Sequence, residues 1–316
     1  MSEPDANQVG YIYGPVPSRR LGRSLGIDVV PAKICTLDCV YCQIGRTTEK
    51  STVRRPFFDV QEVLDELAGK LAGGVEADYI TIGGSGEPTL NSQLGALIDG
   101  IRQITDIPVA IITNGTLLYR ADVRADCAKA DLVVPSLDAA DAAAFDAVNR
   151  PASDISIEKL VSGLVRFRDE FDGQIWLEVF LIEGVNTAPE QIEALKRHIE
   201  RIRPDRIQLN SAVRPAAEPG IEAIARQRLE TIARQIGGKC EIVGAAPEAR
   251  SDRHVQRTRA DVLSMLKRRP CRIEDVCAGI GISRNEAVKH IAHLLDEKAI
   301  ISEPQGGVTY YCTRPD

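Results

Sequence analysis

The chain has 316 residues, of which 44% are hydrophobic and only 4% aromatic, and its formal net charge is −6 at pH 7. This length suits one large domain with a smaller one, and the aliphatic content is sufficient for a large core. The acidic balance argues against attraction of the whole protein to nucleic acid or to an anionic membrane. No apolar stretch approaches the roughly 18 residues of a membrane span. Because the first residues, MSEPDANQVG, are polar and unlike a signal peptide, we expect a soluble, cytoplasmic protein.

Short apolar runs alternate with helical patterns along most of the chain. Val60–Leu71 and Ser156–Phe171, for example, carry apolar residues at helical spacing. In chain order, the predicted elements are strand Leu25–Val30, helix Val60–Leu71, strand Tyr79–Ile82, helix Leu94–Ile104, strand Val109–Ile112, helix Ala121–Ala130, strand Leu132–Pro135, helix Ser156–Phe171, strand Ile175–Ile182, helix Pro189–Ile202, strand Arg206–Leu209, helix Ile221–Ile236 and strand Cys240–Val243. About six β-then-α units predict an α/β fold with a parallel sheet, whose ligands bind at the carboxyl ends of the strands.

The last part of the chain is organised differently. Residues 245–257 are polar and aperiodic, so we expect a linker at 246–256 between a barrel domain at 1–245 and a second domain at 257–316. The elements predicted there are helix Thr258–Lys267, a helix beginning over Ile273–Cys277, a helix from the S-x-x-E capping box Ser283–Glu286 through Asp296, and strands Ile300–Ser302 and Val308–Cys312 around the turn Pro304–Gly307. Three helices and a hairpin predict a small C-terminal winged helix-turn-helix domain.

Three cysteines stand close together near the start of the chain. Cys35, Cys39 and Cys42 have C-x3-C-x2-C spacing. Three thiolates on one short loop can bind three irons of a cubane cluster and leave the fourth iron open for chemistry. A structural zinc site is the alternative, but it needs four ligands, and no second C-x2-C or H-x3-H pair exists. The other five cysteines, which show no cluster spacing, are Cys127, Cys240, Cys271, Cys277 and Cys312.

Glycines and short polar side chains follow successive predicted strands. The segment Thr81–Thr89 reads TIGGSGEPT, and it is not a P-loop because no Gly-Lys-Ser/Thr follows. Thr113-Asn114-Gly115 and Ser136-Leu137-Asp138 come after the next two strands. At these places a barrel enzyme positions ligand groups, although an ordinary glycine-rich turn or turn capping would explain the same residues.

Several arginines are candidate anion ligands. Arg19, Arg20 and Arg23 lie within five residues and could clamp an anionic substrate, or they could form a solvated positive loop. Arg150 could pair with a ligand carboxylate or lie on the surface. After the strand Arg206–Leu209, the candidate substrate contacts are Asn210 and Arg214.

The cysteine motif resembles that of the radical S-adenosylmethionine (radical SAM) superfamily, over roughly residues 14 to 245. The stretch Gly14–Gly26, GPVPSRRLGRSLG, is similar to iron–sulfur oxidoreductases related to the wyosine-tRNA synthesis enzymes. The resemblance implies a partial (β/α)6 TIM-like barrel. Related wyosine enzymes carry further cysteines ahead of the motif, and none precedes Cys35 here, which argues against the same reaction.

The resemblance also implies a site. Cys35, Cys39 and Cys42 would bind a 4Fe-4S cluster, and Glu87 would accept hydrogen bonds from the ammonium group of S-adenosylmethionine. Ser85 and Gly86 are inserted relative to the family's Gly-Gly-Glu-Pro, so the sequence does not decide which pair of glycines contacts the cofactor. The other implied cofactor-binding residues are Tyr41, Gly83, Gly84, Gly86, Asn114, Ser136 and Asp138. Tyr41 would lie near the adenine, or it would only pack against its neighbours. Asp138 would lie near the cofactor or near the substrate.

The implied activity is that of a radical SAM enzyme. One electron from a flavodoxin or ferredoxin would split S-adenosylmethionine, and the resulting 5′-deoxyadenosyl radical would act on a substrate. The winged helix would dock a protein or bind RNA or DNA, with Arg284, Asn285, Lys289 and His290 on its third helix. From Val255 onward ten Lys and Arg face eight Asp and Glu, which is a weak charge for nucleic acid. The alternative function is a SAM- or redox-responsive iron–sulfur regulator that binds DNA.

Overall fold

The protein is built around a single central sheet. The computed structural model describes residues 10–18, 20–212, 216–218, 220–243, 259–282, 284–306 and 308–313. In this part of the chain the central sheet has eight strands, in the order β1-β2-β5-β6-β7-β8-β9-β10. Their bounds are β1 Ile12–Ser18, β2 Gly22–Ile27, β5 Tyr79–Ile82, β6 Val109–Thr113, β7 Leu132–Pro135, β8 Gln174–Phe180, β9 Arg206–Asn210 and β10 Cys240–Ile242. All neighbours from β2 to β10 pair in parallel, and β1 pairs antiparallel with β2.

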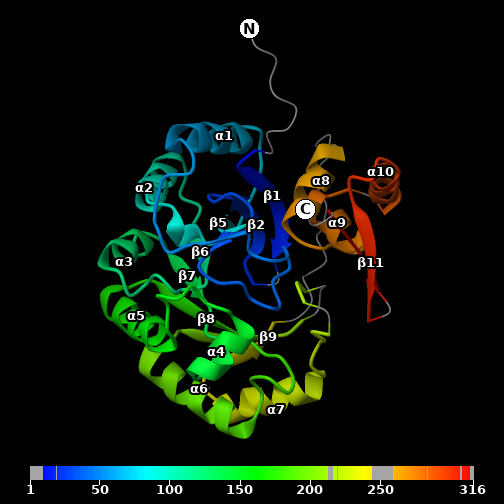
Figure 1. Ribbon diagram of the computed structural model, residues 1–316. Helices are drawn as coiled ribbons and strands as arrows, with labels where there is room; N and C mark the ends of the chain where they lie inside the picture. Colours follow the sequence, from blue (N-terminus) through cyan, green and yellow to red (C-terminus); the bar gives the residue numbers. More distant parts are fainter. Residues whose placement is uncertain are drawn as a thin grey trace.

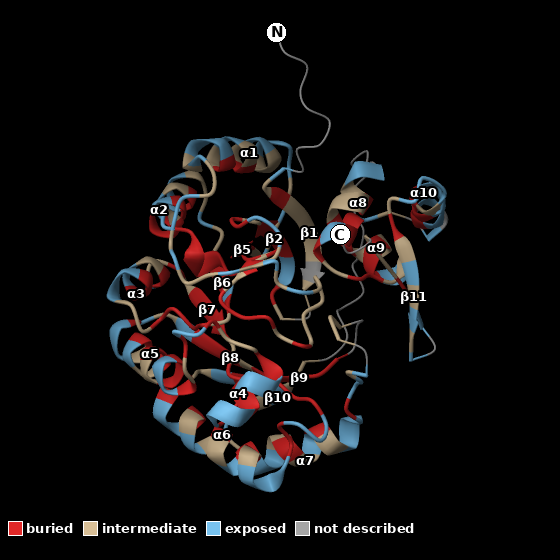
Figure 2. Ribbon diagram, in the orientation of Figure 1, coloured by how far each residue is buried: buried red, intermediate tan, exposed pale blue. Residues whose placement is uncertain are grey.

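Helices cover the outer face of the sheet in an arc (Figure 1). They are α1 Val60–Ala72, α2 Leu94–Ile104, α3 Ala121–Cys127, α4 Ala142–Val148, α5 Ile157–Glu170, α6 Pro189–Ile202 and α7 Arg226–Ile236. Each long helix buries one apolar side against the sheet and leaves charged residues outside, as Figure 2 shows by the pale outer faces of these helices. The shared core includes Leu67, Ile98, Leu164 and Leu195. The predicted α/β fold with a mostly parallel central sheet is therefore confirmed.

Several elements differ from the sequence prediction. Strand β2 is Gly22–Ile27 instead of Leu25–Val30, and the short strands β3 Ile34–Cys35 and β4 Glu49–Lys50 were not predicted. Strand β1 was not predicted, because Gly14, Pro15 and Pro17 interrupt its pattern; as an edge strand it can tolerate proline. The short helix α4 was also not predicted, since its seven residues, AAAFDAV, are too few for a clear helical period. Helix α7 begins at Arg226, five residues later than predicted.

The C-terminal part has a hydrophobic core of its own. It contains α8 Arg259–Arg268, α9 Ile273–Ile280, α10 Arg284–Asp296 and the antiparallel hairpin of β11 Ile301–Gln305 and β12 Val308–Cys312. Its core residues include Val262, Leu266, Val276, Ile291 and Leu294. The predicted capping residue Ser283, the linker at 246–256 and the turn residue Gly307 lie outside the described residues. We call these three helices and the hairpin the C-terminal unit.

The C-terminal unit packs against β1 and covers the edge of the sheet there (Figure 1). Val16 of β1 joins its core. Arg268, at the end of α8, has its guanidinium 4.1 Å from the ring centre of Tyr13 and 3.6 Å from the carboxylate of Asp28. An uncovered edge strand would present unpaired backbone groups, so this packing protects the sheet as well as placing α8 beside the strand ends.

Candidate functional site

The cysteine loop, which carries Cys35, Cys39 and Cys42, follows β2. It lies against the glycine loop, Gly83–Gly86, which follows β5. Its backbone bonds to that loop at two points: Lys33 N donates to Ser85 O at 2.7 Å, and Glu87 N donates to Ile34 O at 3.0 Å. A short parallel pair, β3 Ile34–Cys35 with β4 Glu49–Lys50, closes the base of the cysteine loop. The three cysteines therefore stand at the carboxyl ends of the parallel strands, where the predicted topology places a ligand.

N–H groups surround the three thiols. Asn114 Nδ2 lies 3.5 Å from Cys35 Sγ, and Asn149 Nδ2 lies 3.3 Å from Cys39 Sγ. Burial raises the pKa of Cys35 to about 12, and burial also raises the pKa of Cys39 and Cys42. The charge of Cys42 further raises the pKa of the other two thiols, because the three cysteines are near one another on the loop.

These thiols fit a polynuclear cluster. Buried thiolates need a compensating positive charge, which bound iron supplies, and N–H donors to sulfur are typical of iron–sulfur sites. In the part of the chain that the structure describes, no three His, Cys, Asp or Glu side chains converge on one point as ligands of a single metal ion would. Three cysteines that each bind a different iron need no such convergence. The spacing of the loop thus favours a cluster over a single zinc ion.

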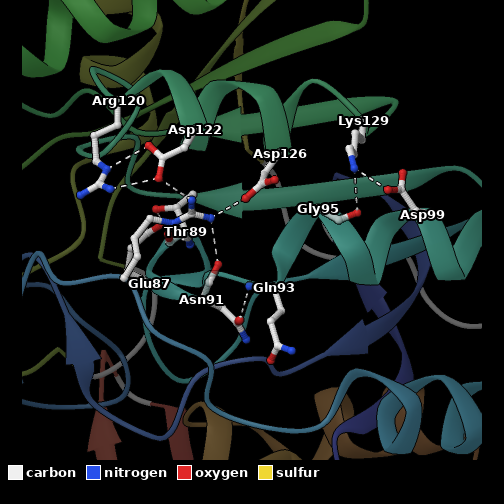
Figure 3. A network of polar contacts seen from close by, with 11 residues as sticks. Glu87, Thr89, Asn91, Gln93, Gly95, Asp99, Arg120, Asp122, Asp126 and Lys129 are labelled. Carbon is white, nitrogen blue, oxygen red and sulfur yellow. Dashed lines mark hydrogen bonds and ion pairs between the residues drawn. The ribbon is translucent and has the colours of Figure 1, made fainter.

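Glu87 is buried and already surrounded by hydrogen-bond donors, of which Figure 3 labels Thr89. Its Oε1 accepts hydrogen bonds from Thr89 N at 3.0 Å, Thr89 Oγ1 at 2.6 Å and Thr113 Oγ1 at 2.6 Å, and its Oε2 accepts from Asn114 N at 2.8 Å. Burial raises its pKa, and the threonine hydrogen bonds oppose that rise. A carboxylate has about four acceptor sites, so four donors occupy most of this one. The carboxylate joins the glycine loop to β6, and its contact with S-adenosylmethionine stays a prediction.

The short 3-10 helix η1, Pro88–Leu90, is fixed from behind by a buried arginine. Arg54 donates to Thr89 O at 2.9 Å and to Asn91 O at 3.0 Å. Its other contacts are ion pairs to Asp122 at 2.8 Å and Asp126 at 2.5 Å, both on α3 (Figure 3). The segment that carries Glu87 is therefore held between the strand ends and a helix.

The glycines of the glycine loop allow a close approach to the cysteine loop. A side chain at Gly86 would collide with the carbonyl oxygen of Ile34, and one at Gly84 would collide with the carboxylate of Asp28. That carboxylate accepts hydrogen bonds from Ser85 N at 3.1 Å and Ser85 Oγ at 2.5 Å. Gly83 and Gly84 line a cavity, whereas Gly86 faces the cysteine loop.

Asp138 lies beneath the cysteine loop. Its carboxylate accepts from Tyr41 OH at 2.5 Å, Asn149 Nδ2 at 2.7 Å and Phe180 N at 2.8 Å. Burial raises its pKa to about 6, although the hydrogen bonds from Tyr41 and Asn149 lower it. The Tyr41 ring stacks on Phe180 with 3.8 Å between ring centres. Ser136 lies beside Glu178 through a single β-bridge and is half-buried.

A cavity of about 360 Å³ opens beside these residues, on the inner side of the sheet. The predicted residues Cys39, Cys42, Tyr41, Gly83 and Gly84 line it. Strand residues complete its wall together with Met265, Arg268 and Arg269 of the C-terminal unit. The inner cavity, as we name it, is thus bounded partly by a segment about 230 residues away in sequence from the cysteine loop.

The candidate arginines lie in different surroundings. Arg20 forms a half-buried ion pair with Glu178 at the wall of the inner cavity, while Arg23 is exposed and pairs with Glu76 at 2.7 Å. Arg150 bonds Glu218 at 2.7 Å. Arg19 and Arg214 lie outside the described residues, so of the three clustered arginines only Arg20 is placed at the cavity by the structure. The candidate Asn210 also lines the inner cavity.

Sequence analysis missed Glu178, Asn149 and Arg268. Glu178 interrupts the apolar strand β8, and an acidic residue in a strand of this kind is a usable signal. Asn149 stands directly before Arg150, and of these two residues the sequence indicates only the charged Arg150 as a candidate ligand. Nothing near Arg268 in the sequence connects it with the cysteine loop.

Comparison with known proteins shows which proteins this chain resembles. Residues 29–200 match the family model described as the Radical SAM superfamily. UPF0026 protein MJ1312 of Methanocaldococcus jannaschii is 33% identical over 308 residues, which are 95% of this chain and 94% of that protein. A Brachyspira hyodysenteriae protein named GTPase Obg is 40% identical over 288 residues, 90% of this chain, but the chain spans only 42% of its length.

A solved structure shares the fold. It is a radical SAM methyltransferase from Sphaerobacter thermophilus, with a TM-score of 0.52 and 17% identity, over 69% of this chain and 65% of that one. No helix among the described residues is long and apolar enough to cross a membrane. Members of the matched superfamily use a 4Fe-4S cluster and S-adenosylmethionine. The match over residues 29–200 and the nearly full-length likeness to UPF0026 proteins show that this chain belongs to the radical SAM superfamily.

Proposed function

We propose that the chain binds a 4Fe-4S cluster through Cys35, Cys39 and Cys42 and cleaves S-adenosylmethionine to a 5′-deoxyadenosyl radical that acts on a substrate. The observation that carries the proposal is the placement of the three thiols on one loop at the strand ends, where Cys39 and Cys42 line a cavity together with Gly83 and Gly84. When bound, the cluster supplies the electron that splits the carbon–sulfur bond of S-adenosylmethionine.

The chain's own residues position and shield the reactants. Asn114 and Asn149 hold Cys35 and Cys39 in place by N–H···S contacts. Gly83 and Gly84 line the inner cavity without side chains and so leave room for the methionine part of S-adenosylmethionine, and Tyr41 offers an aromatic face to the adenine. Met265 and Arg268 close one side of the inner cavity against water. Asn114, Ser136 and Asp138 complete the proposed cofactor site, Asp138 by orienting Tyr41.

We also propose a division of the chain into two domains. We take residues 1–245 as a partial (β/α)6 barrel, 246–256 as a linker and 257–316 as a winged-helix domain that presents RNA or protein. The separate hydrophobic core around Val262 and Leu294 supports this division. A reduced flavodoxin or ferredoxin in the cytoplasm would supply the electron, and the reaction would make the protein an oxidoreductase.

A DNA-binding regulator remains the second candidate function, and nothing in the comparisons supports it. The C-terminal unit contributes residues to the inner cavity, which a separate sensor domain would not need to do. A regulator would bind duplex DNA in a salt-dependent way and form no 5′-deoxyadenosine.

The test uses protein reconstituted without oxygen. We expect about four irons per chain, and 5′-deoxyadenosine after reduction with S-adenosylmethionine present. Changing Cys35, Cys39 or Cys42 to Ala should abolish the product, whereas Cys277→Ala, a half-buried cysteine of the C-terminal unit, should leave iron content and product unchanged. Full product from a Cys39→Ala variant, or zinc in place of iron in the wild type, would refute the proposal.

A further inference from the structure

A second, larger hollow lies between the cysteine loop and the C-terminal unit. Its volume is about 1030 Å³. One wall comes from the cysteine loop and the segment at Phe57 and Phe58, and the other comes from the end of α8 and the hairpin. We call it the outer cleft. It lies near the upper end of the volumes that small-molecule pockets usually have, roughly 300–1,000 Å³.

The outer cleft is basic although the chain as a whole is acidic. Among the described residues two acidic ones line it, Asp28 and Glu303, and its basic residues are Lys33, Arg46, Lys267, Arg268, Arg269 and Lys298. Arg46 is paired with Asp38 and Glu218, and Arg268 approaches Asp28. Within the described part of the chain, no carboxylate lies within ion-pair distance of the other four. Four such cations around one hollow are a binding surface for an anion.

The outer cleft continues into the inner cavity. Cys42, Gln43 and Ile44 of the cysteine loop line both hollows, as do Arg268 and Arg269. The side chain of Arg268 is 8% exposed, and its Nε has no hydrogen-bond partner among the described residues: the nearest Asp28 oxygen is 3.6 Å away. An occupant of the outer cleft would therefore reach the proposed reaction centre at the boundary that these residues form.

Aromatic rings also line the outer cleft. Tyr11 and Phe58 lie with 5.5 Å between their ring centres, and the guanidinium of Arg55 lies over Phe57 at 4.9 Å. All three rings are half-buried. Cations that follow a phosphate backbone, together with rings on which bases stack, are the usual means of binding single-stranded nucleic acid.

We propose, on the basis of the function proposed above, that the substrate is a single-stranded nucleic acid that lies in the outer cleft and has one nucleotide at its boundary with the inner cavity. A phosphorylated peptide would satisfy the cations but has no bases for the rings. The exposed face of α10 is a weaker candidate for the contact, because Arg284 there is paired with Glu274 and Glu286 is also exposed.

The test measures binding of fluorescent ten-nucleotide oligo-U RNA and oligo-T DNA to the reconstituted full chain, without S-adenosylmethionine or reductant. The readout is therefore independent of cofactor cleavage, which is assayed separately. The test variant is Lys267→Glu with Lys298→Glu, and the control, with the same charge change, is Lys239→Glu with Lys159→Glu, two exposed lysines outside the cleft.

Each phosphate contact to a single strand contributes a slope of about −0.7 to log K against log salt. Four contacts should give the wild type a slope of about −2.8, and the cleft variant should show about −1.4 and bind roughly 25-fold more weakly at 0.1 M salt. The control should bind like the wild type and still form 5′-deoxyadenosine. Tighter binding of the RNA or of the DNA identifies the source of the strand.

Three results would overturn the inference. They are equal weakening in both double variants, unchanged binding in the cleft variant, and a tetraphosphorylated peptide that binds more tightly than either oligonucleotide. A protein that forms 5′-deoxyadenosine but shows one of these results keeps its proposed reaction and loses only the proposed substrate.

Discussion

Cys35 and Cys39 are each approached by an asparagine amide, and each asparagine is held by a buried carboxylate. On one side of the cysteine loop, Asn114 Nδ2 lies 3.5 Å from Cys35 Sγ, and its backbone N–H donates to Glu87 at 2.8 Å. On the other side, Asn149 Nδ2 lies 3.3 Å from Cys39 Sγ and also donates to Asp138 at 2.7 Å. The two sides differ in what the carboxylate binds.

Glu87 binds backbone and threonine groups, all from the glycine loop and the end of β6. Asp138 binds two side chains next to the thiols, those of Tyr41 and Asn149. We infer that Glu87 mainly stabilises the fold around the site, whereas Asp138 is a positioning residue for the cysteine loop. Substitutions at the two carboxylates should therefore affect different measurements.

The largest effect is expected from Glu87→Ala. The change leaves two backbone N–H groups and two threonine hydroxyls without their acceptor in a buried place, and each unsatisfied group costs about 1–3 kcal/mol. Partial rearrangement of the hydroxyls reduces the total, so we expect the free energy of unfolding to fall by about 3–5 kcal/mol. Urea titration of the protein without its cluster measures this.

The control for Glu87→Ala is Glu76→Ala. Glu76 is 68% exposed and pairs with Arg23 on the surface, so its loss should change the free energy of unfolding by no more than about 0.5 kcal/mol. Equal, small effects of the two variants would mean that Glu87 is not a structural acceptor. Its four hydrogen bonds would then contribute little to stability, and we would expect S-adenosylmethionine to replace them when it binds.

A smaller effect on stability, but a specific effect on the cluster, is expected from Asp138→Asn. The amide can accept through one oxygen only, so one of the three donors loses its partner, at a cost of about 1–3 kcal/mol. The Asn149 amide should then shift relative to Cys39 Sγ. If the N–H···S bond is worth about 1 kcal/mol more to the reduced cluster, its loss lowers the reduction potential by about 40 mV.

Asp141→Asn is the matched control for this change. Asp141 is the N-cap of α4, three residues away, and asparagine caps a helix about as well as aspartate. The control should leave both the stability and the potential of the reconstituted protein within error. A wild-type potential in Asp138→Asn would contradict the positioning role even if stability falls.

The sequence was a good guide where a regular period or a dense motif was present. The bounds of β5, α2, β7 and α6 agree with the prediction, because the two helices carry apolar residues at helical spacing and the two strands are short apolar runs. The cysteine motif is recognisable in the sequence for the same reason: three like residues within eight positions stand out in any context. In both cases the information is local.

The remaining parts of the site depend on contacts between distant residues. Asn149 lies 110 residues from Cys39, and Tyr41 lies 97 residues from its acceptor Asp138. Arg268 reaches the glycine-loop side of the site only because α8 packs on an edge strand that its prolines conceal in the sequence. Propensity and periodicity carry no information about such pairs, so a single sequence shows which residues are polar but not which of them meet.

The smallest expected effect, Tyr41→Phe, separates the two functions of that ring. The change removes the hydrogen bond from Tyr41 OH to Asp138 and keeps the stack on Phe180, so the free energy of unfolding should fall by about 1 kcal/mol. Tyr41→Leu should cost a further 0.5–1.5 kcal/mol or so, because the aromatic pair is lost as well.

Combining Tyr41→Phe with Asp138→Asn tests whether the two residues act through each other. Since they share one hydrogen bond, the second change should cost little once the first is made, and the coupling energy should be about 1 kcal/mol. The same urea titrations supply all four corners of the cycle. Strict additivity would show that Tyr41 is held by Phe180 alone. Asp138 would then act on the cysteine loop only through Asn149. In that case the carboxylate positions Cys39 and not the loop as a whole.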